Sequence, residues 1–455
     1  MKLPNIKSII LRFTLLLALA VNASAVATPR LMQGPMIAKL DENSATIWAR
    51  VAGEHAFSIE YSKRANFENS EVTRAISPDA SNDYCVQAKI ENLEAGAYYH
   101  YRVLLDGQPL DNPGESDGYP FLTAPAEHHQ AKFSMAFGSG AQVDADGLQA
   151  IWLQVQNARP HAFFWLGQNE SFSGLESQFQ AEQYRKQRNV PFLQPILRSI
   201  PQFSTWDSPE NAPSKQAAQK SLDVFKRYWP NPAYGTDKAP GTYFKHSYGK
   251  VDFFFLDTYT YRRDGKTLLG KAQTRWLTKQ LSESEGVFKI ILNGKSWTRQ
   301  NGEQSESWLA YEDERNAIFD HIQANEIEGV VLVSATDEQA EIKAIPFSEK
   351  GGYDLYELAS SPLAQTPSPE YAEPTQDAIN IQDPYMDAMN FGLLSFDMTL
   401  EDPTISYDVI NVFGESVFPA FQLKASELSN GVVSWKTKID AESLAYIENS
   451  STQAF

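Results

Sequence analysis

The chain has 455 residues, a hydrophobic share of 42% and a formal net charge of −18. That length is too great for one small core and indicates two domains. The acidity argues against nucleic acid and anionic membrane surfaces as partners, because both select clustered Lys and Arg. Cys85 is the only cysteine, which excludes an internal disulfide and a Cys-based structural zinc site.

The N-terminus has the pattern of an export signal. Lys2, Lys7 and Arg12 precede the apolar run FTLLLALAV, and the small-residue sequence ASA follows at 23–25. The run is about half of the roughly 20 residues that a membrane-spanning helix needs. We therefore expect residues 1–25 to be a cleaved Sec-type signal peptide of a periplasmic or secreted bacterial protein, with no integral membrane segment after cleavage.

Residues 28–126 predict a β-sandwich of fibronectin or immunoglobulin type. Short runs of alternating polarity are separated by Asn, Gly, Asp and Glu turns. These runs are MIAKL, SATIWARV, AFSIEYS, YCVQAKIENL and AYYHYRVLLDG.

Residues 132–428 predict an α/β domain, because strands alternate there with helical segments. The predicted strands are KFSMAFGS, HAFFWLG, QFSTW, KVDFFFLD, FKIILNG, GVVLVS and YDLYELAS. The predicted helices are GLQAIWLQVQNA, SQFQAEQYRKQ, SKQAAQKSLDVFKRYW, GKAQTRWLTKQLSES and SWLAYEDERNAIFDHIQAN. Continuously apolar strands indicate sheets buried on both faces. We expect GLLSFDMTL and TISYDVINVFG to complete the sheet, and residues 429–455 to form a polar tail.

Ligands of such sheets bind beyond the carboxyl ends of the strands, where the loops converge. The residues that follow the strands here are mostly Gly, Asn, Asp and Ser. These residue types also end strands simply because they make turns. Strand ends alone therefore do not reveal an active site.

Seven sequence blocks, in their order along the chain and in their residues, resemble the alkaline phosphatase D (PhoD-like) family of secreted metallophosphoesterases. The blocks begin with LQAIW…RPHAFFWLGQN and IPQFSTWDSPENAPS, continue through FKHSYGKVDFFFLDTYTYRR and end with EGVVLVSATDEQAEI. That family also starts with a fibronectin-like domain. The resemblance implies a four-layer α/β/β/α domain in which metal ions activate a water and clamp a phosphate ester.

The first two of the family's four metal motifs are altered in this sequence. The family phrase FGSC appears as FGSG, so Gly140 stands where the family has Cys. The family phrase LGD-N-x-Y appears as LGQNESF, with Gln168 in place of the Asp and Asn169 after it. A carboxamide cannot bridge two cations as an anionic carboxylate does.

The other two motifs are altered as well. WDSPE keeps Asp207 of the family's WDDHD but carries Ser208 and Pro209 in place of the second Asp and the His. SATDEQAE places Thr336 and Glu338 where the family has Asp and His. The eight positions of the four motifs thus outline a former-site pocket without a metal-ligand set, and its catalytic residues are unknown.

Other chemistries have little support. The family usually shows an Arg at the position of Tyr259, so a phosphate-pairing guanidinium is also missing, although Arg262 and Arg263 follow. None of the seven histidines has a metal-ligand spacing, and the sequence has no nucleophile elbow, Walker loop or dinucleotide fingerprint. Asp207 and Glu210 could pair as acid and base, but such pairs at loops are usually solvated or capping.

Three hypotheses remain. The first is an inactive pseudo-phosphatase, without a cofactor, that binds a small molecule, a glycan or a protein. The second is a remodelled site of oxygen ligands for Ca²⁺ or Mg²⁺, drawn from Glu170, Asp207, Glu210, Asp337, Glu338 and Glu341. The third is an ordinary metal-dependent phosphomonoesterase or phosphodiesterase.

Overall fold

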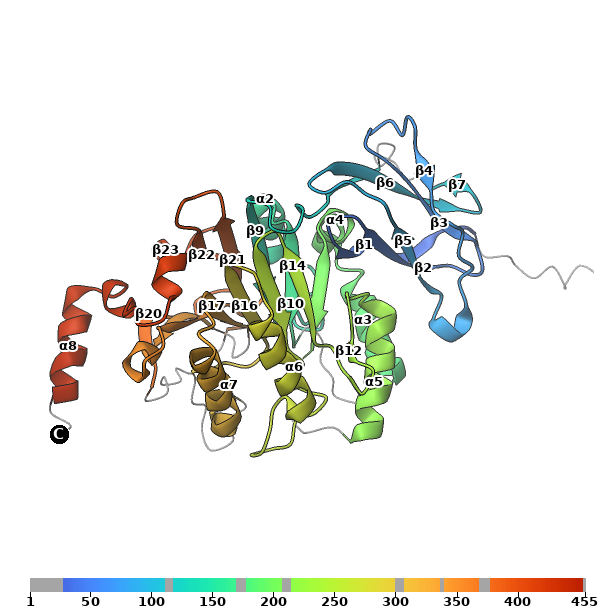
Figure 1. Ribbon diagram of the computed structural model, residues 1–455. Coiled ribbons are helices and arrows are strands. Elements are labelled where there is room, and N and C mark those ends of the chain that lie inside the picture. The colour runs from blue at the N-terminus through green and yellow to red at the C-terminus, as the bar shows by residue number, and fades with distance from the viewer. Residues whose placement is uncertain are drawn as a thin grey trace, which may run out of the picture.

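The structure is a computed structural model that describes residues 28–110, 118–168, 177–206, 214–298, 307–335, 339–367 and 377–452. The N-terminal strands form one body and all later elements form a larger one beside it (Figure 1). Within the described ranges, no helix is both long and apolar enough to cross a membrane. The predicted signal peptide at 1–25 lies outside them.

The N-terminal body is the predicted β-sandwich. One sheet has the order β1-β2-β5, and the other has the order β4-β3-β6-β7 with β8 paired to β6. Alternate apolar side chains such as Ile47, Ile59 and Tyr101 are buried between the sheets. The elements are β1 (Leu31–Leu40), β2 (Ala45–Val51), β3 (Phe57–Ser62), β4 (Glu71–Val72), η1 (Ala80–Asn82), β5 (Cys85–Ile90), β6 (Tyr98–Leu105), β7 (Gln108–Pro109) and β8 (Tyr119–Leu122).

The larger body contains two facing sheets. The first has six strands in the order β11-β10-β9-β21-β22-β23, and the second has seven in the order β14-β15-β16-β17-β19-β18-β20. Their strands are β9 (Lys132–Gly138), β10 (Ala162–Leu166), β11 (Gln202–Thr205), β14 (Phe244–Tyr248), β15 (Val251–Phe255), β16 (Phe288–Asn293), β17 (Val330–Ser334), β18 (Ala340–Ile345), β19 (Leu355–Ala359), β20 (Ile379–Tyr385), β21 (Asn390–Asp397), β22 (Thr404–Asn411) and β23 (Phe421–Lys424). A separate hairpin pairs β12 (Gly235–Thr236) with β13 (Ala239–Pro240).

Helices cover the outer face of each sheet. Phe163 and Trp165 of β10 pack under the helices α2 to α5, whereas Phe164 packs against Phe253 and Phe255 of the other sheet. The outer face of the second sheet is covered by α6 and α7. The helices are α2 (Ile151–Ala158), α3 (Ser177–Gln187), η2 (Pro191–Leu193), α4 (Gln194–Ser199), α5 (Lys215–Tyr228), α6 (Gly270–Ser282), η3 (Trp308–Tyr311), α7 (Glu312–Ala324), η4 (Phe347–Lys350), η5 (Ala425–Leu428), η6 (Trp435–Thr437) and α8 (Ala441–Thr452). This confirms the predicted α/β/β/α layering.

The two bodies are joined by a buried polar and aromatic contact. Asp83 of the sandwich accepts hydrogen bonds from Arg50 and Arg185 at 2.8 Å each, and from the hydroxyl of Tyr228. The guanidinium of Arg188 lies 4.9 Å from the ring of Trp48 and 4.4 Å from that of Trp229. The position of the sandwich on the larger body is therefore fixed by side chains from both.

Several elements were not anticipated. The strands β21 and β22, which were expected to complete the sheet, pair beside β9 in the first sheet, whereas the unpredicted strands β18 and β20 extend the second. The residues after Leu428 also contain more structure than a polar tail. The backbone N–H groups of Ser434 and Trp435 donate to Asp354, Trp435 is buried, and α8 follows.

Candidate functional site

The carboxyl edges of the two sheets meet. The hydroxyl of Thr205, at the end of β11, donates to the carbonyl of Leu256 after β15 at 2.7 Å. The hydroxyls of Ser139 and Ser361, which follow β9 and β19, are 3.1 Å apart. Residues at or just after the ends of four strands thus meet across this edge, as expected for sheets of this kind.

Gly140, where the family has Cys, is closely enclosed. Its φ of 69° lies in the left-handed region that favours glycine. A Cβ there would lie 2.7 Å from Oε1 of Gln365 and 3.2 Å from Cβ of Pro362. The backbone N–H groups of Leu363 and Ala364 donate to the carbonyls of Ser139 and Gly140 at 2.8 and 2.9 Å. The segment 360–365 therefore covers the end of β9, where a thiolate would have to project.

Gln168 lies next to Gly140, because the N–H of Gly140 donates to the carbonyl of Gly167 at 3.4 Å. Gln168 also has a left-handed backbone, with a φ of 47°. The structure therefore brings the first two motif positions together. The other predicted pocket residues lie outside the described residues: Asn169, Asp207, Ser208, Pro209, Thr336 and Glu338.

Asp257, which follows β15, is fully buried, and its carboxylate is hydrogen-bonded to neighbouring backbone groups. Its carboxylate accepts from the N–H groups of Thr242, Tyr259 and Thr260 at 2.7, 3.0 and 2.8 Å, and from the hydroxyl of Thr260 at 2.6 Å. Gln273 of α6 closes the same turn through the N–H and carbonyl of Asp257, at 2.8 Å each. Asp257 thus holds a turn, and its lone pairs are already engaged.

Aromatic and cationic side chains stand beside that turn. Tyr259, at the position of the family's Arg, packs edge-on against Trp206 with 5.4 Å between ring centroids, which bridges the two sheets. Arg262 is buried and its Nε lies 3.1 Å from a carboxylate oxygen of Asp264. The pKa of Tyr311 is raised to about 12, chiefly by burial, with Arg262 opposing the shift and Asp264 adding to it. The guanidinium thus pairs with a carboxylate of its own chain.

A buried ionic network lies on the outer face of the second sheet. Nζ of Lys343 is 2.7 Å from a carboxylate oxygen of Glu341, and both side chains are at most 4% exposed. Their neighbour Glu357 accepts from the hydroxyls of Ser334 and Thr298 and from the N–H of Trp297. Burial raises the pKa of Glu357; Glu341 acts in the same direction and Lys343 opposes. This network was not predicted, although charges within the apolar strands AEIKAI and LYELA are its signal.

The residues present do not fit the two-metal site that the fold family implies. Gly140 has no donor atom, Gln168 offers only an amide, Asp257 is engaged, and Glu341 is paired with an ammonium group. The sequence supplies Ser208, Pro209 and Thr336 where two carboxylates and one imidazole were expected. Over the described ranges, no three His, Cys, Asp or Glu side chains cluster in an arrangement that could hold a metal ion.

Two facing sheets covered by helices, with loops converging at the carboxyl edges, define the metallophosphatase fold. Solved structures share it. The structure of PhoD superposes with a TM-score of 0.66 at 15% identity, covering 95% of this chain and 99% of that one. The purple acid phosphatase PPD1 from yellow lupin (Lupinus luteus) seeds gives a TM-score of 0.63 at 12% identity, covering 90% and 75%.

The family itself is identified from the sequence profiles. Residues 201–407 match the family described as PhoD-like phosphatase, and residues 18–117 match the PhoD-like phosphatase N-terminal domain. No curated protein matches the chain. The chain therefore belongs to the PhoD-like phosphatase family, which confirms the resemblance noted in its sequence.

Proposed function

We propose that this protein is a PhoD-like phosphatase-family member that has lost phosphate-ester hydrolysis and retains the scaffold as a binding module. The observation that carries the proposal is the closure around Gly140. A left-handed backbone, Pro362 and the hydrogen-bonded segment 360–365 occupy the place of the family's first ligand. The replacements at Gln168 and at the other two motifs remove further expected ligands, and Asp207 alone is kept from WDDHD.

We further propose that the protein acts in the periplasm or after secretion. This rests on the basic residues, apolar run and ASA sequence of residues 1–25. The ligand of the module is a small molecule, a glycan or a protein, and nucleic acid is disfavoured by the net charge of −18.

The alternative, a Ca²⁺ or Mg²⁺ site built from oxygen ligands, loses one of its six candidates. Glu341 faces Lys343 at 2.7 Å on the outer side of the sheet, and a cation bound there would be repelled by the ammonium group. The other five candidates lie outside the described residues. The two hypotheses therefore predict different outcomes of a direct measurement of metal binding.

The test uses the purified chain without its predicted signal peptide. Metal content is measured by mass spectrometry, and hydrolysis of bis-p-nitrophenyl phosphate is measured with added Ca²⁺, Mn²⁺ or Zn²⁺, beside an active member of the family. We expect substoichiometric metal, background hydrolysis and a Tm that EDTA does not change. Stoichiometric metal with chelator-sensitive hydrolysis would overturn the proposal.

A double variant distinguishes the binding module from the remodelled Ca²⁺ or Mg²⁺ site. If Ca²⁺ raises the Tm of the wild type, the double substitution Asp207→Asn and Glu210→Gln should remove that rise in the remodelled-site hypothesis. In the binding-module proposal, neither the wild type nor the variant responds to Ca²⁺. Wild-type Ca²⁺ binding that the variant loses therefore supports the remodelled site.

A further inference from the structure

A polar cavity at the boundary of the two bodies lies away from the candidate site. It has a volume of about 240 Å³, which corresponds to roughly eight waters at about 30 Å³ each. The sandwich lines it with residues from 39–42, the connecting segment with residues from 124–127, and the turn between β14 and β15 with residues from 245–249. That turn precedes β15, so the cavity lies at the amino edge of the second sheet, opposite the carboxyl edge.

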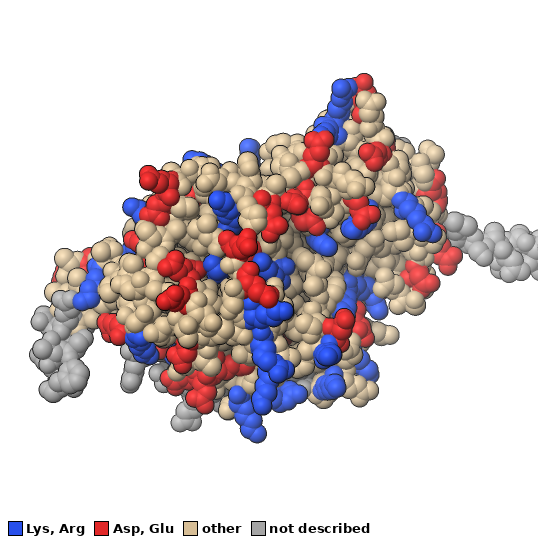
Figure 2. All heavy atoms as spheres, in the orientation of Figure 1, with Lys and Arg blue, Asp and Glu red and all other residues tan. Residues whose placement is uncertain are grey.

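Charged side chains of both signs line the cavity: Lys39, Lys245, Asp41, Glu42 and Glu127. Mixed charge alone does not distinguish it from the rest of the surface. Figure 2 shows Lys and Arg gathered over α6, directly beside Asp and Glu gathered over α7. A binding site therefore needs a further mark, such as a buried polar group that faces the cavity.

His246 is such a group. Its side chain lines the cavity, the residue is only 6% exposed, and the ring packs against Phe203 and Phe253. Among the residues that the structure describes, neither ring nitrogen has a hydrogen-bond partner, although buried polar groups of native proteins are normally paired. Burial lowers the pKa of His246 to about 4, so the ring is neutral at pH 7 and offers one acceptor and one donor.

The carboxylates beside this ring are held in place by backbone groups. Asp41 accepts from the N–H groups of Asn43 and Ser44 at 3.0 and 2.6 Å, and from the hydroxyl of Ser44 at 2.8 Å. Glu42 accepts from the N–H of Glu127 at 2.8 Å. Because a carboxylate has about four acceptor positions, both Asp41 and Glu42 can accept a further hydrogen bond. Two fixed carboxylates beside a neutral imidazole suit an ammonium group.

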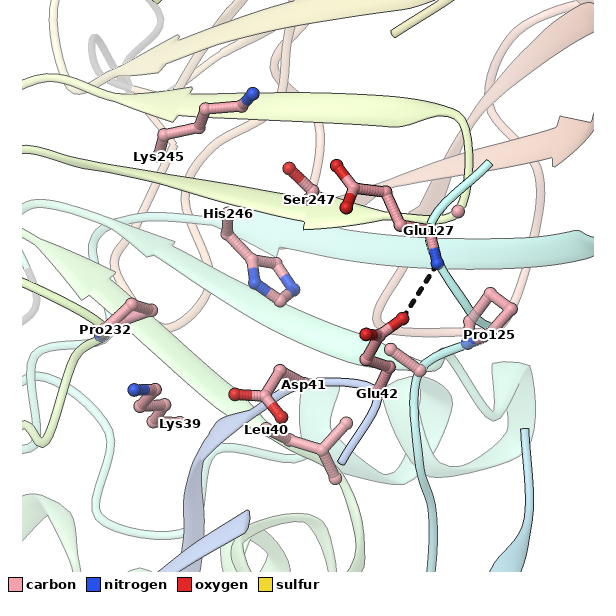
Figure 3. A pocket seen from close by; sticks show the side chains of 12 residues that line it. Lys39, Leu40, Asp41, Glu42, Pro125, Glu127, Pro232, Lys245, His246 and Ser247 are labelled. Atoms are coloured by element: carbon pink, nitrogen blue, oxygen red, sulfur yellow. Dashed lines mark hydrogen bonds between the residues drawn. The ribbon is translucent and has the colours of Figure 1, made fainter. Parts of the chain in front are cut away.

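Of the two lysines, Lys39 is the one available to a ligand. Nζ of Lys245 lies 2.8 Å from a carboxylate oxygen of Asp252, which does not line the cavity. Lys39 is half-buried, its ammonium group has no ion pair in the described part of the chain, and its N–H donates to the carbonyl of Pro230 at 3.1 Å. Figure 3 shows Lys39 on one side of the imidazole and Glu127 on the other. The cavity thus has a cationic and an anionic side.

We propose that this cavity binds a small α-amino acid as its zwitterion. The ammonium group of the ligand donates to Asp41, Glu42 and His246, and its carboxylate pairs with the ammonium group on the other side. A simple amine would leave Lys39 without an anion, and a simple carboxylate would be repelled by Asp41 and Glu42. The volume is below the roughly 300–1,000 Å³ of pockets for larger ligands. The site does not depend on the proposed loss of hydrolysis, because it shares no residue with the candidate site.

The test is calorimetric titration of the purified protein at neutral pH with glycine, L-alanine and L-serine, and with the methyl ester and the N-acetyl form of each. We expect at least one amino acid to bind with a Kd of about 1 mM or lower. Its ester and its N-acetyl form should bind at least about tenfold more weakly, because each loses one charge-assisted contact.

Two variants test the two sides of the cavity. Glu42→Gln keeps an acceptor for the N–H of Glu127 and should weaken binding of the amino acid about tenfold. Lys39→Met should lower the affinity for the amino acid to that for its ester. Lys220→Met is the matched control, because Lys220 is an exposed lysine of α5 that does not line the cavity. It should bind as the wild type does.

Circular dichroism and a Tm measurement should show that every variant is folded. Three results would overturn the proposal: no binding of any of the amino acids up to about 10 mM, a blocked form that binds as tightly as its amino acid, or wild-type affinity in both cavity variants. The first two results need only the wild type, so they decide the matter even if a variant does not fold. Metal content and hydrolysis, which test the proposed function, are separate measurements.

Discussion

Protonation of His246 should loosen the contact between the two bodies. His246 of β14 lines a polar cavity of about 240 Å³ at their boundary, and its ring packs against Phe203 at a tilt of 30°, with 4.3 Å between centroids. Figure 3 shows the imidazole pointing toward Asp41 and Glu42 of the sandwich, with Glu127 of the connecting segment beside them. Glu42 already accepts from the N–H of Glu127 at 2.8 Å.

The size of the expected loss of stability at low pH follows from the burial of the His246 ring. Burial lowers the pKa of His246 from 6.5 to about 4; Asp41 and Asp252 oppose this shift, and Lys39 adds to it. Lys245, whose side chain also lines the cavity, pairs with Asp252 at 2.8 Å. Because the folded pKa is the lower one, the stabilisation is complete above pH 6.5 and is lost as the pH falls toward 4. At about 1.4 kcal/mol per pKa unit, the full effect is on the order of 3 kcal/mol, of which about 2.5 is lost between roughly pH 7.5 and 4.5.

The assay compares urea unfolding of the wild type and His246→Gln over this pH range, followed by tryptophan fluorescence. Other groups titrate in both proteins, so the difference between the two pH profiles isolates His246. We expect the variant to lose about 2.5 kcal/mol less stability than the wild type on acidification. His129→Gln, at an exposed position of the connecting segment, is the control and should follow the wild type. Identical profiles for the wild type and His246→Gln would refute the reasoning.

Three further substitutions test other features. Gly140→Cys should reduce the free energy of unfolding by about 1–3 kcal/mol because of the left-handed backbone at this position, even though the amide of Gln365 can move aside. The control Gly147→Ala, which has open space around it, should change the free energy of unfolding little. Denaturant unfolding measures both variants. Lys343→Met should cost about 3–5 kcal/mol by leaving Glu341 without its counter-charge, and adding Glu341→Gln should restore part of it in a double-mutant cycle. Arg188→Lys should reduce the free energy of unfolding by about 2–4 kcal/mol, because a lysine cannot keep both carbonyl hydrogen bonds. It should also speed proteolysis between the two bodies, because the ring contact with Trp48 of the sandwich is weakened.

Periodicity predicted the elements that bury a regular face. The run HAFFWLG became β10 because it is apolar throughout, and both faces of β10 are covered in the structure. The predicted helix GKAQTRWLTKQLSES became α6, and Leu277 and Leu281, four residues apart on it, are both buried in the core. Strands such as β18, AEIKAI, were not predicted, because Glu341 and Lys343 gave it the polarity of an exposed strand although their mutual pairing allows burial.

Most of the predicted pocket residues lie outside the described residues, so the candidate site stays a prediction. Of the two motif positions that the structure describes, Gly140 donates its N–H to the carbonyl of Gly167, the residue before Gln168. The covering segment 360–365 was not predictable, because it is distant in sequence and contacts β9 only through the pairing of two sheets. The pairing of Tyr259 with Trp206 across the sheets was hidden for the same reason.

Contacts between side chains and backbone hold the carboxyl edge together. The hydroxyl of Tyr407 of β22 donates to the carbonyl of Ala359, the last residue of β19, at 2.8 Å, which ties the two sheets at this edge. The hydroxyl of Ser360 donates to Asn390 at 2.7 Å, and Asn390 donates to the carbonyl of Ser361 at 3.0 Å. Each of these groups is buried and would cost free energy if it lost its partner. These contacts supply the edge with cohesion of its own, which the proposed loss of the family's metal ligands requires.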